Sequence, residues 1–266
     1  EPTTQYGFNF KRNETDELLR LREALNNRKQ DGVFDVDMAE EEYHKLEKME
    51  RKFKDWLMAD TWTAAFFTEK SEIDLEFYPT NVTLENLKEN QPIKPELIEN
   101  ILKVADYYNF FHYHLEFPEV FEKGGFDCLL GNPPWEQIQL EEEEFFAGKE
   151  NEIADTKNAS KRLAKIECLK TNNPELYKEF KEAVDNSNKV ANFIKLSGAY
   201  SHSTFGWLNT YLVFTEKYDQ NLSKKGYCGI IIPSGILSDK NSMPLFHSLL
   251  KKGKVSEAID YINIKG

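Results

Sequence analysis

The segment Gly131-Asn-Pro-Pro-Trp-Glu136 holds the residue types in this chain that are best suited to chemistry. Asn132 offers a side-chain carbonyl as a hydrogen-bond acceptor. The carbonyl of Pro133 is a second acceptor, and its direction is constrained because a residue that precedes a proline is held in the extended region. Pro133 and Pro134 also lack backbone N–H donors. The result is a rigid, acceptor-rich corner that fits a planar amine carrying two hydrogens.

Trp135 adds a large flat face beside these acceptors. An aromatic face of this kind can stack on a nucleobase, which is worth about 1–3 kcal/mol per base. Two acceptors pulling on both hydrogens of an amine would also turn its nitrogen lone pair out of conjugation with the ring. The other interpretation of the same residues is structural: a strand that ends at prolines, with the tryptophan packed in the core.

The run FDCLLG (126–131) follows a glycine pair and predicts a short, buried, parallel strand that ends at the Asn-Pro-Pro corner. Two further strands are predicted at 227–235 and 255–264, and helices at 207–222 and 243–253. This order is typical of a doubly wound α/β sheet. Ligands bind at the carboxyl ends of the strands in such sheets, which is where Asn132 would lie.

The sequence outside these strands is mainly helical. Helices are predicted after Asp16 and after Asp37, and another runs from Pro95 to about 116–121. The segment 60–67 is apolar on all sides and should be buried. Two smaller features also carry expectations: Glu141–Glu144 predicts a solvated helix face, and Cys128 and Cys228 lie in apolar runs that predict buried, reduced thiols.

Composition excludes several classes of function. The 34 basic and 46 acidic residues give a net charge of −12, so the chain is not a stand-alone electrostatic binder of nucleic acid. No stretch is long and apolar enough to span a bilayer.

His112 and His114 have no third ligand at a suitable spacing, which favours surface or hydrogen-bonded histidines over a metal site. There is no G-x-S-x-G elbow for a hydrolase.

The Asn-Pro-Pro-Trp motif after a hydrophobic strand resembles the catalytic motif of amino-group methyltransferases that use S-adenosylmethionine. The longer string FHYHLEFPEVFEKGGFDCLLGNPPWEQ (111–137) resembles the large adenine-specific DNA methyltransferases of type II restriction–modification systems. In the type IIG enzymes among them, methylase and endonuclease can share one chain. Residues 206–218 and 226–239 resemble the helix, strand and Pro-Ser loop that follow the motif in this family.

The resemblance implies a role for each motif residue. Asn132 and the Pro133 carbonyl would hold the amine of an adenine flipped out of double-stranded DNA, with Pro134 completing the corner and Trp135 stacking on the ring. The methyl group is already activated on the cofactor, so alignment is needed rather than a strong base or a metal. Residues at the same predicted edge that could contact the substrate are Trp207, Asn209, Pro233 and Ser234.

The chain departs from the family pattern in one respect, because it has no G-x-G loop between a strand and a helix that could bind the cofactor. We therefore expect a piece of a longer cytoplasmic protein: the C-terminal half of a Rossmann-like class I methyltransferase sheet with large helical insertions. The cofactor-binding half would precede Glu1 and a DNA-reading domain would follow Gly266. The piece alone should be inactive and should hold no S-adenosylmethionine.

The resemblance divides the chain into four parts: a mainly helical insertion, the catalytic strand and loop, a second helical insertion and the remaining α/β core, at 1–122, 123–136, 137–205 and 206–266. Two alternatives remain open. The Asn-Pro-Pro corner also serves methylation of glutamine amides in proteins, or of small-molecule amines. A non-catalytic helical interaction module would be indicated if Asn132 and Trp135 were fully buried.

Overall fold

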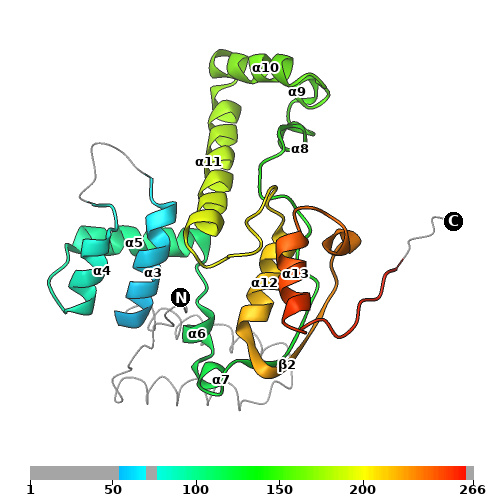
Figure 1. The fold of residues 1–266 in the computed structure, drawn as a ribbon. Helices are drawn as coiled ribbons and strands as arrows, with labels where there is room; N and C mark the ends of the chain where they lie inside the picture. The colour runs from blue at the N-terminus through cyan, green and yellow to red at the C-terminus, as the bar shows by residue number, and fades with distance from the viewer. Residues whose placement is uncertain (1–53, 70–76, 262–266) are drawn as a thin grey trace, which may run out of the picture. The chain divides into compact units, whose positions relative to one another are not determined.

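The computed structural model describes residues 54–69 and 77–261, and the chain divides into two compact units between Glu116 and Phe117. Each unit is built from its own elements, coloured along the chain in Figure 1. The helices predicted after Asp16 and Asp37 lie outside the described residues.

The described part of the first unit is helical. It contains α3 (Lys54–Phe67), α4 (Asn81–Lys88), α5 (Pro95–Tyr108) and the short α6 (Tyr113–Glu116). Helix α3 packs against both α4 and α5 (Figure 1). The segment 60–67 lies in α3 and is largely buried, but Trp62 is 39% exposed, so the expectation of burial on all sides was wrong at that residue. The hydroxyls of Thr61 and Thr63 donate to carbonyls four residues earlier, which lets both polar side chains be buried.

A buried Asp–His pair joins α3 to the chain that follows α5. Asp60 is 1% exposed, and its Oδ1 lies 2.8 Å from Nε2 of His112. The imidazole also meets the edge of the Trp56 ring, with centroids 5.9 Å apart. The prediction of a hydrogen-bonded histidine at 112 is therefore confirmed, and the pair is a tertiary link within the first unit.

Helix α5 ends well before the predicted boundary near 116–121. Its last residue is Tyr108, and the C-cap Asn109 has a left-handed backbone with φ 51°. Asparagine tolerates this conformation better than most residues, so the helix can end there without a glycine. The chain then starts the separate helix α6 before it reaches Pro118.

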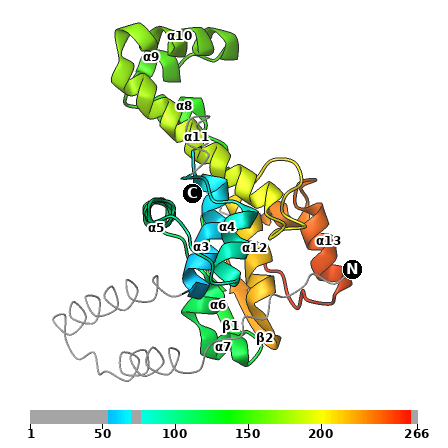
Figure 2. The same ribbon diagram turned by 90° about the vertical axis from the view of Figure 1, so that its left-hand side faces the viewer.

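The second unit contains a parallel pair of strands, which Figure 2 shows side by side. Strand β1 (Phe126–Gly131) occupies the predicted residues. Strand β2 (Leu222–Ile230) begins and ends five residues earlier than predicted, because pairing starts at Phe126↔Leu222 and then shifts register to Cys128↔Tyr227. It stops short of Pro233, which has no N–H to donate. The mixed α/β class and the parallel direction are confirmed.

The other elements of the second unit are helices that precede, separate and follow these two strands along the chain. They are α7 (Pro118–Glu122), α8 (Glu142–Phe146), α9 (Asn151–Ala154), α10 (Ala159–Asn172), α11 (Pro174–Leu196), α12 (Thr210–Asn221) and α13 (Met243–Lys251), with a 3-10 turn η2 (Ser234–Leu237). Helices α12 and α13 lie within the predicted ranges 207–222 and 243–253. None of the helices in the described ranges is long and apolar enough to cross a bilayer.

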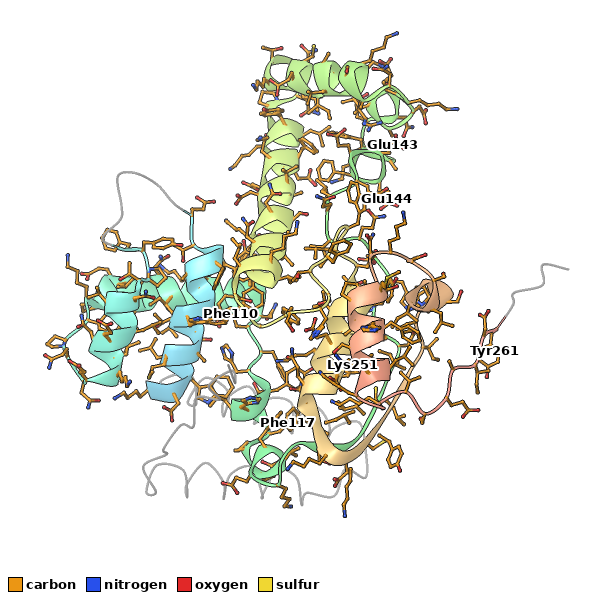
Figure 3. The ribbon with its side chains drawn as sticks, in the orientation of Figure 1. Phe110, Phe117, Glu143, Glu144, Lys251 and Tyr261 are labelled. Atoms are coloured by element: carbon orange, nitrogen blue, oxygen red, sulfur yellow. The ribbon has the colours of Figure 1, made fainter. Side chains whose placement is uncertain are left out.

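Helices α8 to α11 form an arm with a hydrophobic cluster of its own. The cluster comprises six buried side chains: Phe146, Ile153, Ile166, Leu169, Leu176 and Phe180. Arg162 pairs with Glu142 and Glu143 at 2.7 and 2.6 Å, so part of the Glu141–Glu144 run is neutralised within the arm. Figure 3 shows Glu143 and Glu144 on α8; both side chains are exposed, as predicted.

Two smaller clusters set the position of α12. One joins α12 to η2 and α13 through Tyr211, Leu212, Ile236 and Leu245. The other joins α12 to the end of α11 through Ile194, Leu208 and Val213. Helix α12 is therefore held by two clusters. Its first residue, Thr210, comes two positions after Leu208, which belongs to the second cluster.

The third predicted strand, at 255–264, is absent over the residues that can be compared. Residues 254–261 have no regular secondary structure, and 262–264 lie outside the described range. Tyr261 is 86% exposed and stands on extended chain in Figure 3. Within the described residues, β1 and β2 pair only with each other, so this segment makes no ladder of hydrogen bonds that would define a strand.

The expectation of burial was also wrong for the strands and their thiols. Leu130 is 77% exposed and Tyr227 is 74% exposed, and Cys128 and Cys228 are both exposed. A parallel strand is buried only when both faces of its sheet are covered. Helix α12 packs on the sheet at β2, and within the described residues no second layer covers the face that carries Leu130 and Tyr227.

The glycine pair before β1 allows a matched test of this packing. A Cβ on Gly125 would lie 2.5 Å from the carbonyl oxygen of Asn221 and 2.8 Å from the backbone at Leu222, whereas a Cβ on Gly124 would meet nothing within 4 Å. Both residues have positive φ, 117° and 95°. Gly124→Ala should therefore cost only the backbone term, about 1–2 kcal/mol, and Gly125→Ala distinctly more. Denaturant midpoints of the two variants measure the difference, and equal midpoints would contradict the close approach.

Candidate active site

The Asn132–Trp135 loop leaves the sheet at the carboxyl end of β1. Asn132 and Pro134 are exposed, Trp135 is 51% exposed, and Pro133 is buried. The buried proline ring anchors the corner, and the polar and aromatic side chains on either side of it face outward. The structural interpretation, in which the tryptophan packs in the core, does not fit this exposure.

Thr210, the first residue of α12, binds the backbone within and just after the Asn132–Trp135 loop and clamps it in place. Its hydroxyl donates its one hydrogen to the Pro134 carbonyl, at 2.7 Å, shared with the Glu136 carbonyl at 3.1 Å, and accepts from the N–H of Glu136 at 3.0 Å. The N–H of Thr210 also donates to the Glu136 carbonyl at 3.0 Å. One side chain therefore fixes the loop backbone at two residues, Pro134 and Glu136.

Backbone pairing continues beyond this clamp. Gln137 and Asn209 form an isolated antiparallel bridge, and the N–H of Ile138 donates to the Leu208 carbonyl at 3.0 Å. The residues on both sides of the long helical arm are thus joined at the base of the arm. The loop that follows β1 and the segment that begins α12 form one local structure.

Main-chain atoms beyond β2 hold the tryptophan. The N–H of Ile231 donates to the Gly131 carbonyl at 3.0 Å, which extends the strand pairing by one residue. The Ile231 carbonyl then accepts from Nε1 of Trp135 at 3.2 Å. The indole ring is therefore oriented by the end of the neighbouring strand, although half of its surface stays open.

The structure brings together some of the other predicted site residues. Asn209 is the N-cap of α12 and pairs with the loop, and Trp207, two residues earlier, is 60% exposed. Pro233 is the N-cap of η2 and Ser234 its first residue, two and three positions after the Ile231 carbonyl that holds Trp135. Pro233 and Ser234 thus follow the same strand end, but the structure gives no hydrogen bond from either side chain to the Asn132–Trp135 loop.

Two residues that sequence reasoning missed support this edge. Thr210 could have been found, because the first turn of a helix leading into a parallel strand lies at the carboxyl edge of the sheet. Glu216 gave no signal, since TEKYDQ also fits a solvated helix face. It is 3% exposed, and its carboxylate accepts from the backbone N–H groups of Ser201, His202 and Ser203.

The Glu216 carboxyl is strongly stabilised as an anion. Burial alone would raise its pKa, but hydrogen bonds from the Ser203 hydroxyl at 2.6 Å and from the Ser201 and Ser203 backbone outweigh burial, and the pKa lies below its ordinary value. The carboxylate is thus an ionised, fully engaged anchor for the 201–203 turn. It is not available as a base, because its oxygens already accept several hydrogen bonds.

The chemistry available at the loop is that of alignment. The Pro134 carbonyl is engaged by Thr210, whereas within residues 54–69 and 77–261 neither the Asn132 side chain nor the Pro133 carbonyl has a hydrogen-bond partner. In the same ranges there is no group of three or more His, Cys, Asp or Glu residues that could hold a metal ion. The loop therefore offers two neutral acceptors beside an aromatic face.

Comparison with known proteins identifies the family. The family model of the Eco57I restriction-modification methylases matches residues 10–265, nearly the whole chain. No curated protein and no solved structure matches the chain. The predicted kinship with restriction–modification methylases, which rested on the 111–137 string, is thereby confirmed at the level of the family. With its Asn-Pro-Pro-Trp loop at the end of a parallel strand, the chain belongs to the Eco57I restriction-modification methylase family.

Proposed function

We propose that this chain is part of an enzyme that methylates the N6 amine of adenine in a specific DNA sequence, within a restriction–modification or phage-defence system. The observation that carries the proposal is the exposed Asn132 and Trp135 at the carboxyl end of β1, in a loop held by Thr210 and Ile231. The family supports DNA methylation by a restriction–modification enzyme, and the residue chemistry of the loop supports an amine as the target.

The proposed mechanism uses the two acceptors without hydrogen-bond partners to hold the amine. The side-chain carbonyl of Asn132 and the carbonyl of Pro133 each accept one hydrogen of the adenine NH₂, which takes the nitrogen lone pair out of conjugation with the ring. Trp135 stacks on the adenine, which must leave the duplex because the reacting nitrogen cannot be reached inside it. S-adenosylmethionine, when bound, supplies a methyl group already activated by a positive sulfur. The loop has only to align the nitrogen for in-line displacement, and the methylated nitrogen then releases one proton to water.

The neutral acceptor set is consistent with that cofactor, because no residue of the loop has to remove a proton before the nitrogen attacks. We assign no residue of this chain to the cofactor itself. The cofactor-binding loop and the basic DNA groove are proposed to come from the remaining parts of the same cytoplasmic polypeptide. We also propose, from the family resemblance, that the chain consists of a helical insertion, the catalytic strand and loop, a second helical insertion and the remaining α/β core, with boundaries at 123, 137 and 206. Trp207, Asn209, Pro233 and Ser234 are proposed to contact the substrate beside the loop.

The test is methyl transfer by the intact protein to unmethylated double-stranded DNA of random sequence, with labelled S-adenosylmethionine. We expect N6-methyladenine at one recognition sequence, and no turnover by residues 1–266 alone. Methylcytosine would contradict the assignment of adenine. Labelled glutamine in a protein substrate, with none in DNA, would favour the protein-methylating alternative.

Substitution of Trp135 separates stacking from the indole hydrogen bond. Trp135→Ala should lower kcat/KM for DNA methylation by about 10- to 100-fold, because stacking on one base is worth about 1–3 kcal/mol. Trp135→Phe keeps an aromatic face and loses only the bond to the Ile231 carbonyl, so it should retain most of the activity. Steady-state kinetics on the intact protein measures both variants. An alanine variant as active as the phenylalanine variant would contradict stacking.

A further inference from the structure

The Ser201–Ser203 turn is bound to α12 by a single carboxylate. Glu216 accepts from the N–H groups of three consecutive residues, at 2.8 Å for Ser201, 3.1 Å for His202 and 2.8 Å for Ser203. The Ser201 and Ser203 hydroxyls donate to it as well, at 3.2 and 2.6 Å. Ser203 is fully buried. One buried carboxylate accepts all of these bonds. Movement of the turn would therefore leave a buried charge and several N–H donors without partners, which is costly.

The next residues present two aromatic side chains to solvent. Phe205 is 59% exposed and Trp207 is 60% exposed, with Gly206 between them in a left-handed conformation of φ 67°. A Cβ on Gly206 would overlap the side-chain oxygen of Asn241, so the chain also passes close to the residues that precede α13. Two large aromatic side chains exposed two positions apart on a fixed turn offer a small apolar contact surface.

The far end of the same segment is joined to the Asn132–Trp135 loop. The Leu208 carbonyl accepts from Ile138, Asn209 pairs with Gln137, and Thr210 binds the loop at Pro134 and Glu136. Helix α12 thus carries both attachments, with Thr210 at its start and Glu216 six residues later. Phe205 and Trp207 stand on the short span between these two attachment points, beside the loop.

We propose that Glu216 is a positioning residue, which holds the Ser201–Ser203 turn so that Phe205 and Trp207 contact the DNA bases next to the extruded adenine. The proposal rests on the proposed function and adds a DNA-facing element to it. Apolar side chains that enter a base stack offset part of the free energy that unstacking the bases requires. Aromatic rings can do this next to any base, because every base has a flat face on which they stack. A turn of this kind acts only if it is held rigidly, because a mobile turn loses entropy on binding.

The test is a double-mutant cycle in the intact protein, read as kcat/KM for methylation of unmethylated random-sequence DNA. Glu216→Gln removes the charge at nearly constant shape, and the paired change Phe205→Ala with Trp207→Ala removes the presented rings. We expect Glu216→Gln to lower kcat/KM about tenfold, mainly through KM for DNA, and less than about twofold when both rings are already absent. Ser203→Ala, which removes one hydroxyl donor only, should give a smaller loss in the same direction and keeps the test usable if Glu216→Gln folds poorly.

Asp219→Asn is the matched control on α12, because Asp219 pairs with Lys254 and not with the Ser201–Ser203 turn. It should leave kcat/KM unchanged. Equal losses from Glu216→Gln, or from Ser203→Ala, with and without the rings would overturn the proposal and indicate a general role in stability. Failure of the proposed function is recognised separately, since then the wild-type protein itself would place no methyl group on adenine.

Discussion

Asn132→Ala should lower kcat for methyl transfer about 10²- to 10³-fold in the intact protein, which is the usual loss when one preorganised hydrogen-bonding group at a reacting centre is removed. The Asn132 side chain stands exposed at the end of β1, and it directly precedes Pro133, whose carbonyl is the second proposed acceptor. Without its amide oxygen, only one hydrogen of the amine would be held, and the nitrogen lone pair would stay in conjugation with the ring. Binding of DNA should change much less than kcat.

Two further variants make this result specific. Asn132→Asp keeps an acceptor oxygen at the same place and should retain far more activity than the alanine variant. Gln139→Ala removes an exposed amide seven residues further along and should behave like the wild type. Single-turnover methylation at saturating DNA measures the chemical step directly. An alanine variant with wild-type kcat would exclude Asn132 from the reaction and leave the loop as a binding element only.

Thr210→Val should have the second largest effect, although Thr210 contacts no substrate in the proposed mechanism. The substitution keeps the shape but leaves the Pro134 carbonyl without its donor and the Glu136 N–H without its acceptor. Loss of such bonds costs about 1 kcal/mol each in stability. The larger consequence is for geometry: displacement of the Asn132 acceptor by about 1 Å can lower the rate about 10²-fold.

Thr210→Ser is the control for this prediction, because it keeps the hydroxyl and loses only a methyl group. It should retain most of the activity and most of the stability. The comparison needs two measurements on each variant, a denaturant midpoint and kcat for methylation. If Thr210→Val lost stability but kept its rate, the clamp would be structural, and the loop would hold its geometry through its remaining bonds to the backbone of residues 208–210 and Ile231.

The sequence predicted some elements well because local rules decide them. Strand β1 begins after a glycine pair and ends at two prolines, and its bounds follow from these residues. The end of α5 was misplaced because a single asparagine, Asn109, took a left-handed backbone that several residues allow but none requires. The predicted strand at 255–264 failed for another reason: a strand exists only beside a partner, and an apolar run does not reveal whether the partner is adjacent.

The candidate site shows the same division. The Asn132–Trp135 loop could be found because the chemistry is carried by side chains in one short run of sequence. Thr210 binds a residue 76 positions away in the sequence, and Glu216 binds a residue 13 positions away. Their roles therefore depend on tertiary contacts. A buried glutamate that binds three backbone N–H groups has the same neighbours in sequence as one on a solvated helix. The exposed Cys128 and Leu130 were mispredicted because burial depends on the covering layer, which local sequence does not encode.

Apart from the Thr210 hydroxyl, the Asn132–Trp135 loop is held through main-chain atoms of its neighbours. The partners of Gly131, Trp135 and Ile138 are the backbone of Ile231 and the carbonyl of Leu208, whose own side chains are not used. Residue 231, whose side chain is exposed, can therefore drift in sequence without disturbing the corner, provided that its backbone stays in place, whereas Leu208 is also needed in the buried cluster that positions α12. Divergent members of such a lineage could alter the rim around the corner, and with it the DNA they accept, while the corner itself keeps its shape.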